Sequence, residues 1–195
     1  MTLRQAAFLD RDGVINVDRG YVHRRADFEF IDGVFDAAIK LRKKGYALFV
    51  ITNQSGIGRG LYTEEQFLAL DSWMREQFAQ HGSVIEATYY CPHHPIDAID
   101  QFRRACDCRK PAPGMLLRAA KEHALDLAQS VMLGDTIADL QAAKSAGLPR
   151  RVLLGKNAVA KPEEPPVPGL VSARFRSLIE AASAIEANGL EIAAS

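Results

Sequence analysis

Short, continuous runs of apolar residues recur along the chain, separated by longer segments in which apolar positions return every three or four residues. A continuous apolar run bounded by turn residues is typical of a strand buried on both faces, as in a parallel sheet. The pattern therefore predicts strands over residues 5–9, 46–51, 87–90, 130–133 and 151–154.

The segments between these runs have the spacing and end signals of amphipathic helices. Thr63 and Gln66 form a capping-box pattern at the start of one helix, and Pro113 begins another. Gly45 and Gly147 supply helix ends. The expected helices cover residues 34–44, 63–80, 113–123, 137–146 and 175–188, and a surface loop is expected over residues 156–169.

Strands that alternate with helices predict an α/β protein, in which helices cover both faces of a mostly parallel sheet. A chain of 195 residues suits one domain of medium size, and no composition shift marks a second. We therefore expect a single domain over residues 1–190.

The composition disfavours several classes of protein. The 24 basic and 24 acidic residues cancel, which argues against a general binder of nucleic acids or membrane surfaces. No apolar stretch approaches membrane-spanning length, and the charges at residues 10–12 interrupt any signal-peptide core. We expect a cytoplasmic protein with reduced cysteines and with neither a nucleic acid nor a membrane as its partner.

Two acids, Asp10 and Asp12, directly follow the first predicted strand. Carboxylates at the end of a buried strand are costly unless they hold a metal or take part in chemistry. One of them can act as a nucleophile while the other transfers a proton. The alternative is a solvated turn, and this pair alone does not decide between the two.

Further polar groups follow other predicted strands. Residues 52–55 (Thr-Asn-Gln-Ser) come after the second strand, and Gly134-Asp135 follows the strand at 130–133. Because the carboxyl ends of parallel strands share one edge of a sheet, these groups are expected to meet there. Asp135 could complete a Mg²⁺ site with Asp10, or it could cap the next helix. Asp139, one turn later, could orient the site, or its charge could stabilise the helix N-terminus through the helix dipole.

Lys110 precedes the helix at 113–123, and its ammonium could neutralise a phosphoryl oxygen and an attacking carboxylate. The alternative is a solvated lysine, the usual state of this residue type. Residues 52–55 likewise offer hydroxyl, amide and backbone N–H donors for a phosphate, or form an ordinary polar turn. The glycines of residues 56–60 are expected to form a flexible loop carrying one cation, Arg59.

All three cysteines of the chain lie in one polar segment with neighbouring histidines, over residues 91–108. Four nitrogen and sulfur ligands suit a closed, tetrahedral and structural Zn²⁺ site, and this interpretation assigns Cys91, His93, Cys106 and Cys108. The alternative is a set of reduced thiols packed as small apolar groups, which the polar surroundings disfavour.

In order along the chain, these motifs resemble the haloacid dehalogenase-like (HAD) phosphohydrolases: Asp10-Arg11-Asp12-Gly13, Thr52, Lys110 and Gly134-Asp135-Thr136-Ile137-Ala138-Asp139. The resemblance implies a Rossmann-like three-layer sandwich and a phosphoaspartate mechanism. Asp10 would be the nucleophile, and Asp12 the general acid and then the base. Thr52 and Lys110 would bind the transferring phosphoryl group. Mg²⁺ would be held by Asp10, Asp135 and the backbone carbonyl of Asp12.

A closer resemblance, to the bacterial heptose 1,7-bisphosphate phosphatases within that superfamily, rests on longer motifs. These motifs cover residues 8–16, 52–60, 91–95, 106–111 and 134–135. The resemblance implies removal of the C7 phosphate from a sugar bisphosphate, in a pathway to nucleotide-activated heptose and lipopolysaccharide. It also favours His93 over His94 as the zinc ligand, and it implies substrate contacts from Asn16, Asn53, Gln54, Ser55, Arg59 and Arg109.

The chain has no room for a large cap domain, so the zinc loop and residues 17–30 are expected to enclose the substrate. We also expect the protein to be a monomer. The nearest alternative is a histidinol-phosphate phosphatase, whose zinc-bearing members share this arrangement. A nucleic-acid 3′-phosphatase is disfavoured by the neutral charge. A non-catalytic, zinc-stabilised binding module is a different class, although every acid and base that the mechanism needs is present.

Overall fold

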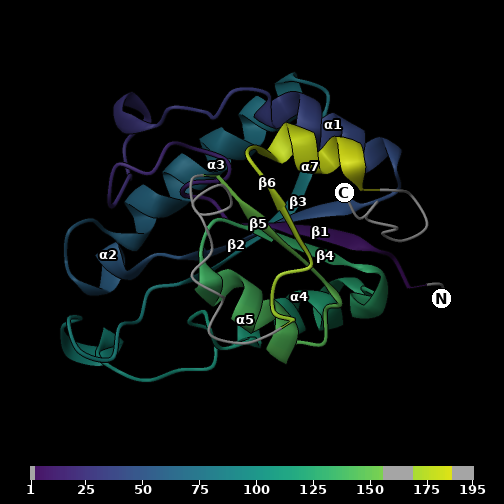
Figure 1. Cartoon of the computed structure of the whole chain (residues 1–195). Helices are drawn as coiled ribbons and strands as arrows, with labels where there is room; N and C mark the ends of the chain where they lie inside the picture. Colours follow the sequence, from purple (N-terminus) through teal and green to yellow (C-terminus); the bar gives the residue numbers. More distant parts are fainter. Residues whose placement is uncertain (1–2, 156–168, 186–195) are drawn as a thin grey trace.

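The computed structural model describes residues 3–155 and 169–185, which form one parallel sheet between two layers of helices (Figure 1). The six strands lie in the order β3-β2-β1-β4-β5-β6, and every neighbouring pair is parallel. Their bounds are Ala6–Leu9 (β1), Ala47–Asn53 (β2), Ile85–Cys91 (β3), Val131–Gly134 (β4), Arg150–Leu154 (β5) and Ala173–Phe175 (β6).

The α-helices and short 3₁₀ turns occupy the crossover connections. The α-helices are Val34–Lys43 (α1), Ser55–Gly58 (α2), Glu64–Gln80 (α3), Gly114–His123 (α4), Ile137–Ser145 (α5) and Leu178–Ala184 (α7). The 3₁₀ turns cover Arg25–Asp27, Asp100–Phe102 and Leu127–Gln129. None of the described helices is long and apolar enough to cross a membrane.

Alternate residues of each strand supply the two sides of the core, as the continuous apolar runs require. In β1, Ala7 and Leu9 pack with α1, α3 and α7, whereas Ala6 and Phe8 pack with α4 and α5. All four side chains are fully buried. Strand β1 thus has no solvent-facing side, which explains its lack of polar alternation.

The strand order fixes where a ligand can bind. The chain goes from β1 to β2 on one side, and β4 lies against the other side of β1. The crevice at the carboxyl ends of β1 and β4 is therefore a topological switch point, where open α/β sheets bind their ligands.

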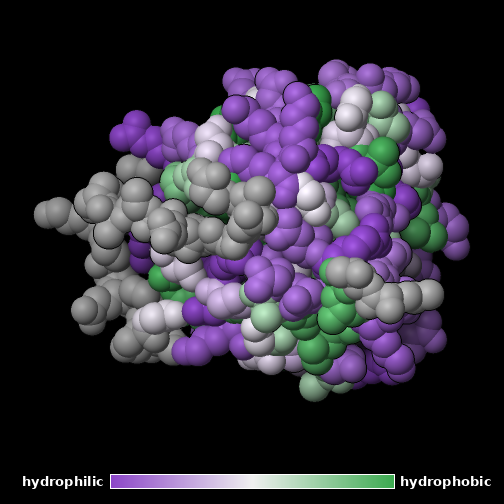
Figure 2. Space-filling model, turned by 90° about the vertical axis from the view of Figure 1, so that its right-hand side faces the viewer, coloured by the Kyte–Doolittle hydropathy of each residue, from purple (hydrophilic) through white to green (hydrophobic). Residues whose placement is uncertain are grey.

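On the face drawn in Figure 2, hydrophilic residues dominate and the apolar residues form only small groups.

Most of the predicted elements are confirmed to within two residues. The Thr63 capping box is present: its hydroxyl accepts from the backbone N–H of Gln66 at 3.2 Å, and the Gln66 side chain accepts from the backbone N–H of Thr63 at 2.9 Å. Gly45 and Gly147 have φ values of 87° and 86°, which explains why a residue without a side chain ends each helix there.

Two expectations about the local structure were wrong. Residues 55–58 form the short helix α2 rather than a flexible loop, since the backbone N–H of Arg59 donates to the carbonyl of Ser55 at 2.9 Å. Residues 173–175 form β6, where a helix over 175–188 was expected to begin, because pairing with β5 overrides the local pattern. The helix itself, α7, covers only Leu178–Ala184. The expected loop at 156–169, apart from Gly169, and the end of that helix lie outside the described residues.

Helix α7 is held in place by a lysine at the end of α1. The Lys44 ammonium donates to the carbonyl oxygens of Ala182 and Ser183, at 2.9 and 3.0 Å, and to that of Ile185. These carbonyls lie at the carboxyl end of α7, where a cation also favours the helix dipole. One side chain therefore satisfies several helix-end acceptors and fixes α7 against α1.

We predict that Lys44→Met lowers the free energy of unfolding by about 1–3 kcal/mol, because charge-assisted bonds to helix-end carbonyls are lost. The neighbouring Lys43 is exposed, so Lys43→Met should change stability by less than about 0.5 kcal/mol. Urea unfolding of both variants measures the difference. Equal stability of the two variants would show that the Lys44 contacts contribute nothing.

Candidate active site

The strand ends of β1, β2 and β4 bring the predicted polar groups to one small cavity of about 150 Å³. Asp10 and Asp135 directly follow β1 and β4, and Thr52 and Asn53 are the last two residues of β2. The cavity is lined by Asp10, Asp12, Asp18, Thr52, Asn53, Lys110, Asp135, Thr136 and Asp139. The juxtaposition expected from the parallel sheet is therefore present.

Lys110 is the cation at the centre of this cavity and is only 4% exposed, so the solvated alternative is wrong. Its ammonium donates to Asp10 at 2.8 Å, to Asp139 at 2.6 Å and to the carbonyl of Ile51 at 2.8 Å. Although burial opposes it, the attraction of the two carboxylates raises the pKa of Lys110, so the ammonium stays charged.

Asn53 fixes the backbone of this lysine. The Asn53 side-chain amide donates to the carbonyl of Lys110 at 3.1 Å, and its oxygen accepts from the Lys110 N–H at 3.1 Å. A side chain at the end of β2 thus sets the position of a residue 57 places later in the chain. Asn53 also lines the cavity, and its expected contact with the substrate stays a prediction.

Asp139 supports the site from the start of α5. One of its oxygens accepts from Lys110, and the other accepts from the backbone N–H and the hydroxyl of Thr136, at 3.0 and 2.6 Å. Thr136 and Asp139 form a capping box, so Asp135 is not the helix cap. With both oxygens committed to protein groups, Asp139 orients Lys110 and the helix end.

Around Lys110, the three carboxylates of Asp10, Asp135 and Asp139 outnumber the one ammonium, so this part of the cavity has an excess of negative charge. Burial, and then the charge of Asp139, raises the pKa of Asp10 to about 8 and that of Asp135 to about 6. Acids with raised pKa values in a cleft are candidates for cation binding or catalysis, since a bound cation would restore their charged forms.

The arrangement fits a divalent cation. Oxygens of Asp10, Asp135 and Asp139 lie within 4.8 Å of one another. Gly13 allows this approach: a Cβ atom at that position would lie 2.1 Å from an Asp135 oxygen. Because Asp139 is committed elsewhere, Asp10 and Asp135 are the carboxylates that can hold Mg²⁺, which favours one or two carboxylates with phosphate and water.

Asp12, the second acid of the motif, is held by a set of donors. The Arg11 guanidinium donates through Nε and NH2, at 3.1 and 2.9 Å, and the Asn16 amide donates at 3.0 Å. The Gln54 amide adds a bond of 3.1 Å. Asn16 is fully buried, so its side chain supports Asp12 instead of facing the cavity as a substrate contact.

The sequence did not indicate a site role for two residues of this network, Arg11 and Tyr62. Arg11 is 1% exposed, and it also donates to the carbonyl of Val22 at 2.8 Å, which ties residues 17–30 to the site. Tyr62 donates from its hydroxyl to Gln54 at 2.6 Å. The position of Arg11 between two acids was a signal for its role, whereas nothing local marked Tyr62.

The two arginines expected at the substrate lie on separate loops, and neither lines the cavity at the strand ends. Arg59 follows α2 and donates to Asp97 at 2.7 Å, and Arg109 donates to the carbonyl of His93 at 3.1 Å. Desolvation, followed by the charges of Arg109 and Arg59, lowers the pKa of His94. The positive charges of both loops therefore disfavour protonation of one histidine, His94. Ser55 is the first residue of α2, and its carbonyl accepts from the backbone N–H of Arg59.

The cysteine segment forms the cluster that the sequence predicted. Sulfur–sulfur distances are 3.1–3.5 Å, and His93 Nδ1 lies 3.3 Å from the Cys108 sulfur and 3.6 Å from that of Cys91. Ligands 2.3 Å from a tetrahedral zinc would be about 3.8 Å apart, so the four groups fit one ion. His94 is turned away and accepts from the backbone N–H groups of Ile96 and Asp97.

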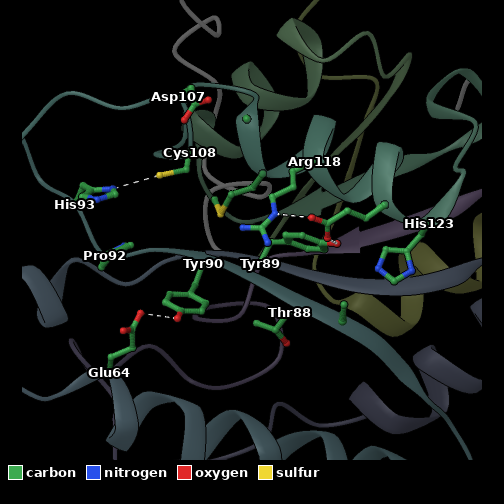
Figure 3. Close-up of a pocket in the computed structure, with 14 residues that line it drawn as sticks. Glu64, Thr88, Tyr89, Tyr90, Pro92, His93, Asp107, Cys108, Arg118 and His123 are labelled. Atoms are coloured by element: carbon green, nitrogen blue, oxygen red, sulfur yellow. Dashed lines mark hydrogen bonds and ion pairs between the residues drawn. The ribbon is translucent and has the colours of Figure 1, made fainter. Parts of the chain in front are cut away.

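A larger cavity, of about 660 Å³, lies along β3 beside this cluster (Figure 3). Two of the carboxylates that line it are paired, since Tyr89 and Arg118 donate to Glu122, and Tyr90 donates to Glu64. The cavity at the strand ends, with its buried lysine and clustered acids, is consequently the better candidate for catalysis.

Comparisons with known proteins agree with this geometry. A family model described as HAD-hydrolase-like matches residues 107–175. D-glycero-β-D-manno-heptose-1,7-bisphosphate 7-phosphatase from Photorhabdus laumondii is 54% identical over 149 residues, covering 76% of this chain and 79% of that protein. The enzyme of the same name from Escherichia coli K12 is 52% identical over 158 residues, covering 81% of this chain and 83% of that protein.

Among solved structures, D,D-heptose 1,7-bisphosphate phosphatase from B. bronchiseptica, complexed with magnesium and phosphate, matches with a TM-score of 0.76 and 32% identity. The match covers 92% of this chain and 96% of that one. The length covered, the identity and the shared fold lead to one conclusion: the chain belongs to the D-glycero-β-D-manno-heptose-1,7-bisphosphate 7-phosphatase family of HAD-like hydrolases.

Proposed function

We propose that this enzyme hydrolyses the C7 phosphate of D-glycero-D-manno-heptose 1,7-bisphosphate and releases heptose 1-phosphate. The observation that carries the proposal is the buried Lys110 between Asp10 and Asp139, in a chain 54% identical to a protein named for that reaction. The product would supply nucleotide-activated heptose for lipopolysaccharide core or surface-glycan synthesis. We further propose that residues 1–190 act as one domain, supported by the single sheet.

In the first step, an oxygen of Asp10 attacks the C7 phosphorus and the bond from phosphorus to the sugar oxygen breaks. Asp12 gives its proton to the departing oxygen, so a neutral hydroxyl leaves and a phosphoaspartate remains. Lys110 is 2.8 Å from Asp10 and neutralises charge that would otherwise repel the phosphate dianion. The Thr52 hydroxyl, at the end of β2, can donate to a phosphoryl oxygen.

In the second step, Asp12 removes a proton from a water molecule as the water oxygen attacks the same phosphorus. The bond from phosphorus to Asp10 breaks, which returns the free carboxylate and releases inorganic phosphate. Asp12 is 23% exposed on its side chain, so water can reach it, unlike the fully buried Asp139. Exposure therefore supports Asp12 as the proton carrier.

Asp10, Asp135 and the backbone carbonyl of Asp12 would hold Mg²⁺ at this site. When bound, the ion would polarise the phosphoryl group and offset the charge of the attacking carboxylate. The excess of carboxylates over cations and the room left by Gly13 support this assignment.

A sugar bisphosphate carries a second phosphate, which needs a cation outside the reaction centre. Lys110 is committed to Asp10 and Asp139 inside the cavity, whereas Arg59 follows α2 and Arg109 directly precedes Lys110 in the chain, both outside the cavity lining. Arginine binds phosphate in a bidentate manner, so these two side chains, together with Ser55, are the proposed contacts. The cationic amine of histidinol phosphate would instead be repelled there, which disfavours that alternative.

We propose that Cys91, His93, Cys106 and Cys108 hold a structural Zn²⁺. The Nδ1 atom of His93 faces the sulfur atoms of Cys108 and Cys91, at 3.3 and 3.6 Å, so Nδ1 is the ring nitrogen that would bind the ion. Four protein ligands leave no position for a reacting water, so the role of the ion would be to fix the loop that carries Arg109 and Lys110.

Asp10→Asn should lower kcat by at least about a thousandfold, because the neutral amide cannot attack phosphorus. Phosphate release from purified protein measures the loss, and circular dichroism checks the fold. Asp126→Asn is a matched control, since Asp126 only caps a 3₁₀ turn through Ala128 and should leave turnover unchanged. Retained activity in Asp10→Asn would contradict the phosphoaspartate mechanism.

Cys106→Ser and His93→Ala should each reduce the zinc content and the melting temperature, since structural zinc contributes to folding. His94→Ala should keep the zinc, because His94 lies outside the cluster. Mass spectrometry of the metal content and thermal unfolding test the three variants. Purified wild-type protein without zinc, unchanged in melting temperature after zinc is added, would refute the site.

Arg109→Ala should lower kcat/KM for heptose 1,7-bisphosphate by about 10- to 100-fold, since a charge-assisted contact contributes roughly 1.5–3 kcal/mol. Hydrolysis of a simple monophosphate ester should change far less. Arg118→Ala, which removes an exposed arginine paired with Glu122, is the control. Equal losses on both substrates would remove Arg109 from this role, and faster turnover of histidinol phosphate by the wild type would favour the alternative function.

A further inference from the structure

A line of hydrogen bonds leads from Asp12 away from the cavity to a buried hydroxyl. The side-chain nitrogen of Gln54 donates to Asp12 at 3.1 Å and to the Thr52 hydroxyl at 2.8 Å. The side-chain oxygen of Gln54 accepts from the Tyr62 hydroxyl at 2.6 Å. Gln54 and Tyr62 are 2% and 5% exposed, so water does not replace these partners.

The Gln54 amide has a donating nitrogen end and an accepting oxygen end, so its orientation matters. The Tyr62 hydroxyl determines that orientation. The nitrogen end can donate to the Asp12 carboxylate, whereas the oxygen end would be repelled by it. The Tyr62 hydroxyl satisfies the buried oxygen end and so holds the amide in the orientation that serves Asp12. Without this hydroxyl, the amide oxygen would lack a partner and the side chain would be free to rotate.

The position of Tyr62 is itself fixed on several sides. Its ring stacks on that of His23, with 4.8 Å between the centroids and 9° between the planes. Gly56, in α2, leaves the space that the ring occupies, because a Cβ atom there would lie 2.1 Å from Tyr62 Cε1. Tyr62 also directly precedes Thr63, the cap of α3. These contacts therefore fix the position of the Tyr62 hydroxyl.

Gln54 is the donor that connects Asp12 to the phosphate-binding side of the site. Arg11 and Asn16 belong to the same loop as Asp12, whereas Gln54 directly follows β2 and also bonds to Thr52. We propose that Tyr62, acting through Gln54, is a positioning residue that fixes the Asp12 carboxylate relative to the Thr52 hydroxyl. This inference rests on the proposed function, in which Asp12 transfers the protons.

The choice of leaving group makes the inference testable. A sugar or glycerol oxygen must receive a proton from Asp12 as its bond to phosphorus breaks, whereas p-nitrophenolate is stable without one. Misplacement of Asp12 should therefore slow phosphoaspartate formation from an alkyl phosphate but not from p-nitrophenyl phosphate. Hydrolysis of the phosphoaspartate needs Asp12 as a base with either substrate, so it should slow in both cases.

The first experiment compares Tyr62→Phe with Tyr46→Phe. Tyr46 is the matched control, since it is 1% exposed and its hydroxyl accepts from Arg150 at 2.9 Å, in the core. Tyr62→Phe should lower kcat for glycerol 3-phosphate by about 10- to 100-fold and change KM by less than about twofold. With p-nitrophenyl phosphate it should give a fast burst of one nitrophenolate per enzyme, followed by slow turnover. Tyr46→Phe should behave as the wild type does.

A second experiment separates positioning from a general loss of structure. Gln54→Met removes both ends of the amide and should give the same burst and the same loss of kcat. Because Tyr62 acts through Gln54, adding Tyr62→Phe to Gln54→Met should cause no further loss. If Tyr62→Phe does not fold, the burst kinetics of Gln54→Met carry the test.

Wild-type kcat in Tyr62→Phe, a burst slowed as much as turnover, or losses that multiply in the double variant would each overturn the inference. So would a Gln54→Met variant without the burst. Failure of the proposed substrate is a separate result: the wild type would not hydrolyse heptose 1,7-bisphosphate, while the simple phosphate esters would still report on Tyr62.

Discussion

The buried ion pairs of Lys110 are the interaction on which the rest of the site depends. Two opposite charges taken out of water are costly unless the geometry is good and the remaining donors are satisfied. Lys110 meets both conditions with Asp10, Asp139 and the carbonyl of Ile51. Since losing one partner would leave an uncompensated charge, each of these groups constrains the positions of the others.

The sheet supplies the framework for these contacts. β1 places Asp10, β2 places Ile51 and Asn53, and the turn after β4 leads to Asp139 in α5. Close packing is required at the last of these points, because a Cβ atom on Gly134 would lie 2.4 Å from that of Asp139. A glycine at the end of β4 is therefore needed to bring α5 close enough for its carboxylate to reach Lys110.

The structure separates reaction chemistry from substrate selection. The groups proposed for bond breaking are buried at the strand ends, where neighbouring elements hold them rigidly. The arginines proposed for selection lie on separate loops outside that cavity lining, and one of them, Arg109, directly follows the cysteine cluster. Changes in these loops could alter the preferred substrate without disturbing Lys110 and its carboxylates.

The strands, most of the helices and the residues of the motifs could be predicted from the sequence alone. These signals are local: apolar runs mark buried strands, and cap residues such as Thr63 satisfy helix ends within a few positions. The candidate ligands for Mg²⁺ and Zn²⁺ were also identified, since parallel strand ends converge and since thiols and imidazole are typical zinc ligands. Pairing with β5 formed β6 against the local pattern, because partners distant in the sequence decide whether a three-residue segment becomes a strand.

The hydrogen-bond partners of the polar side chains, by contrast, depend on the tertiary fold and could not be predicted from the sequence. Asn16, Asn53 and Gln54 all looked like substrate contacts, yet their amides bond to Asp12, to the Lys110 backbone and to Tyr62. An amide can donate or accept in many directions, so its partner depends on which groups the fold brings within about 3 Å. Tyr62 carries no local signal for the same reason: its role exists only because α2 and α3 place its hydroxyl beside Gln54.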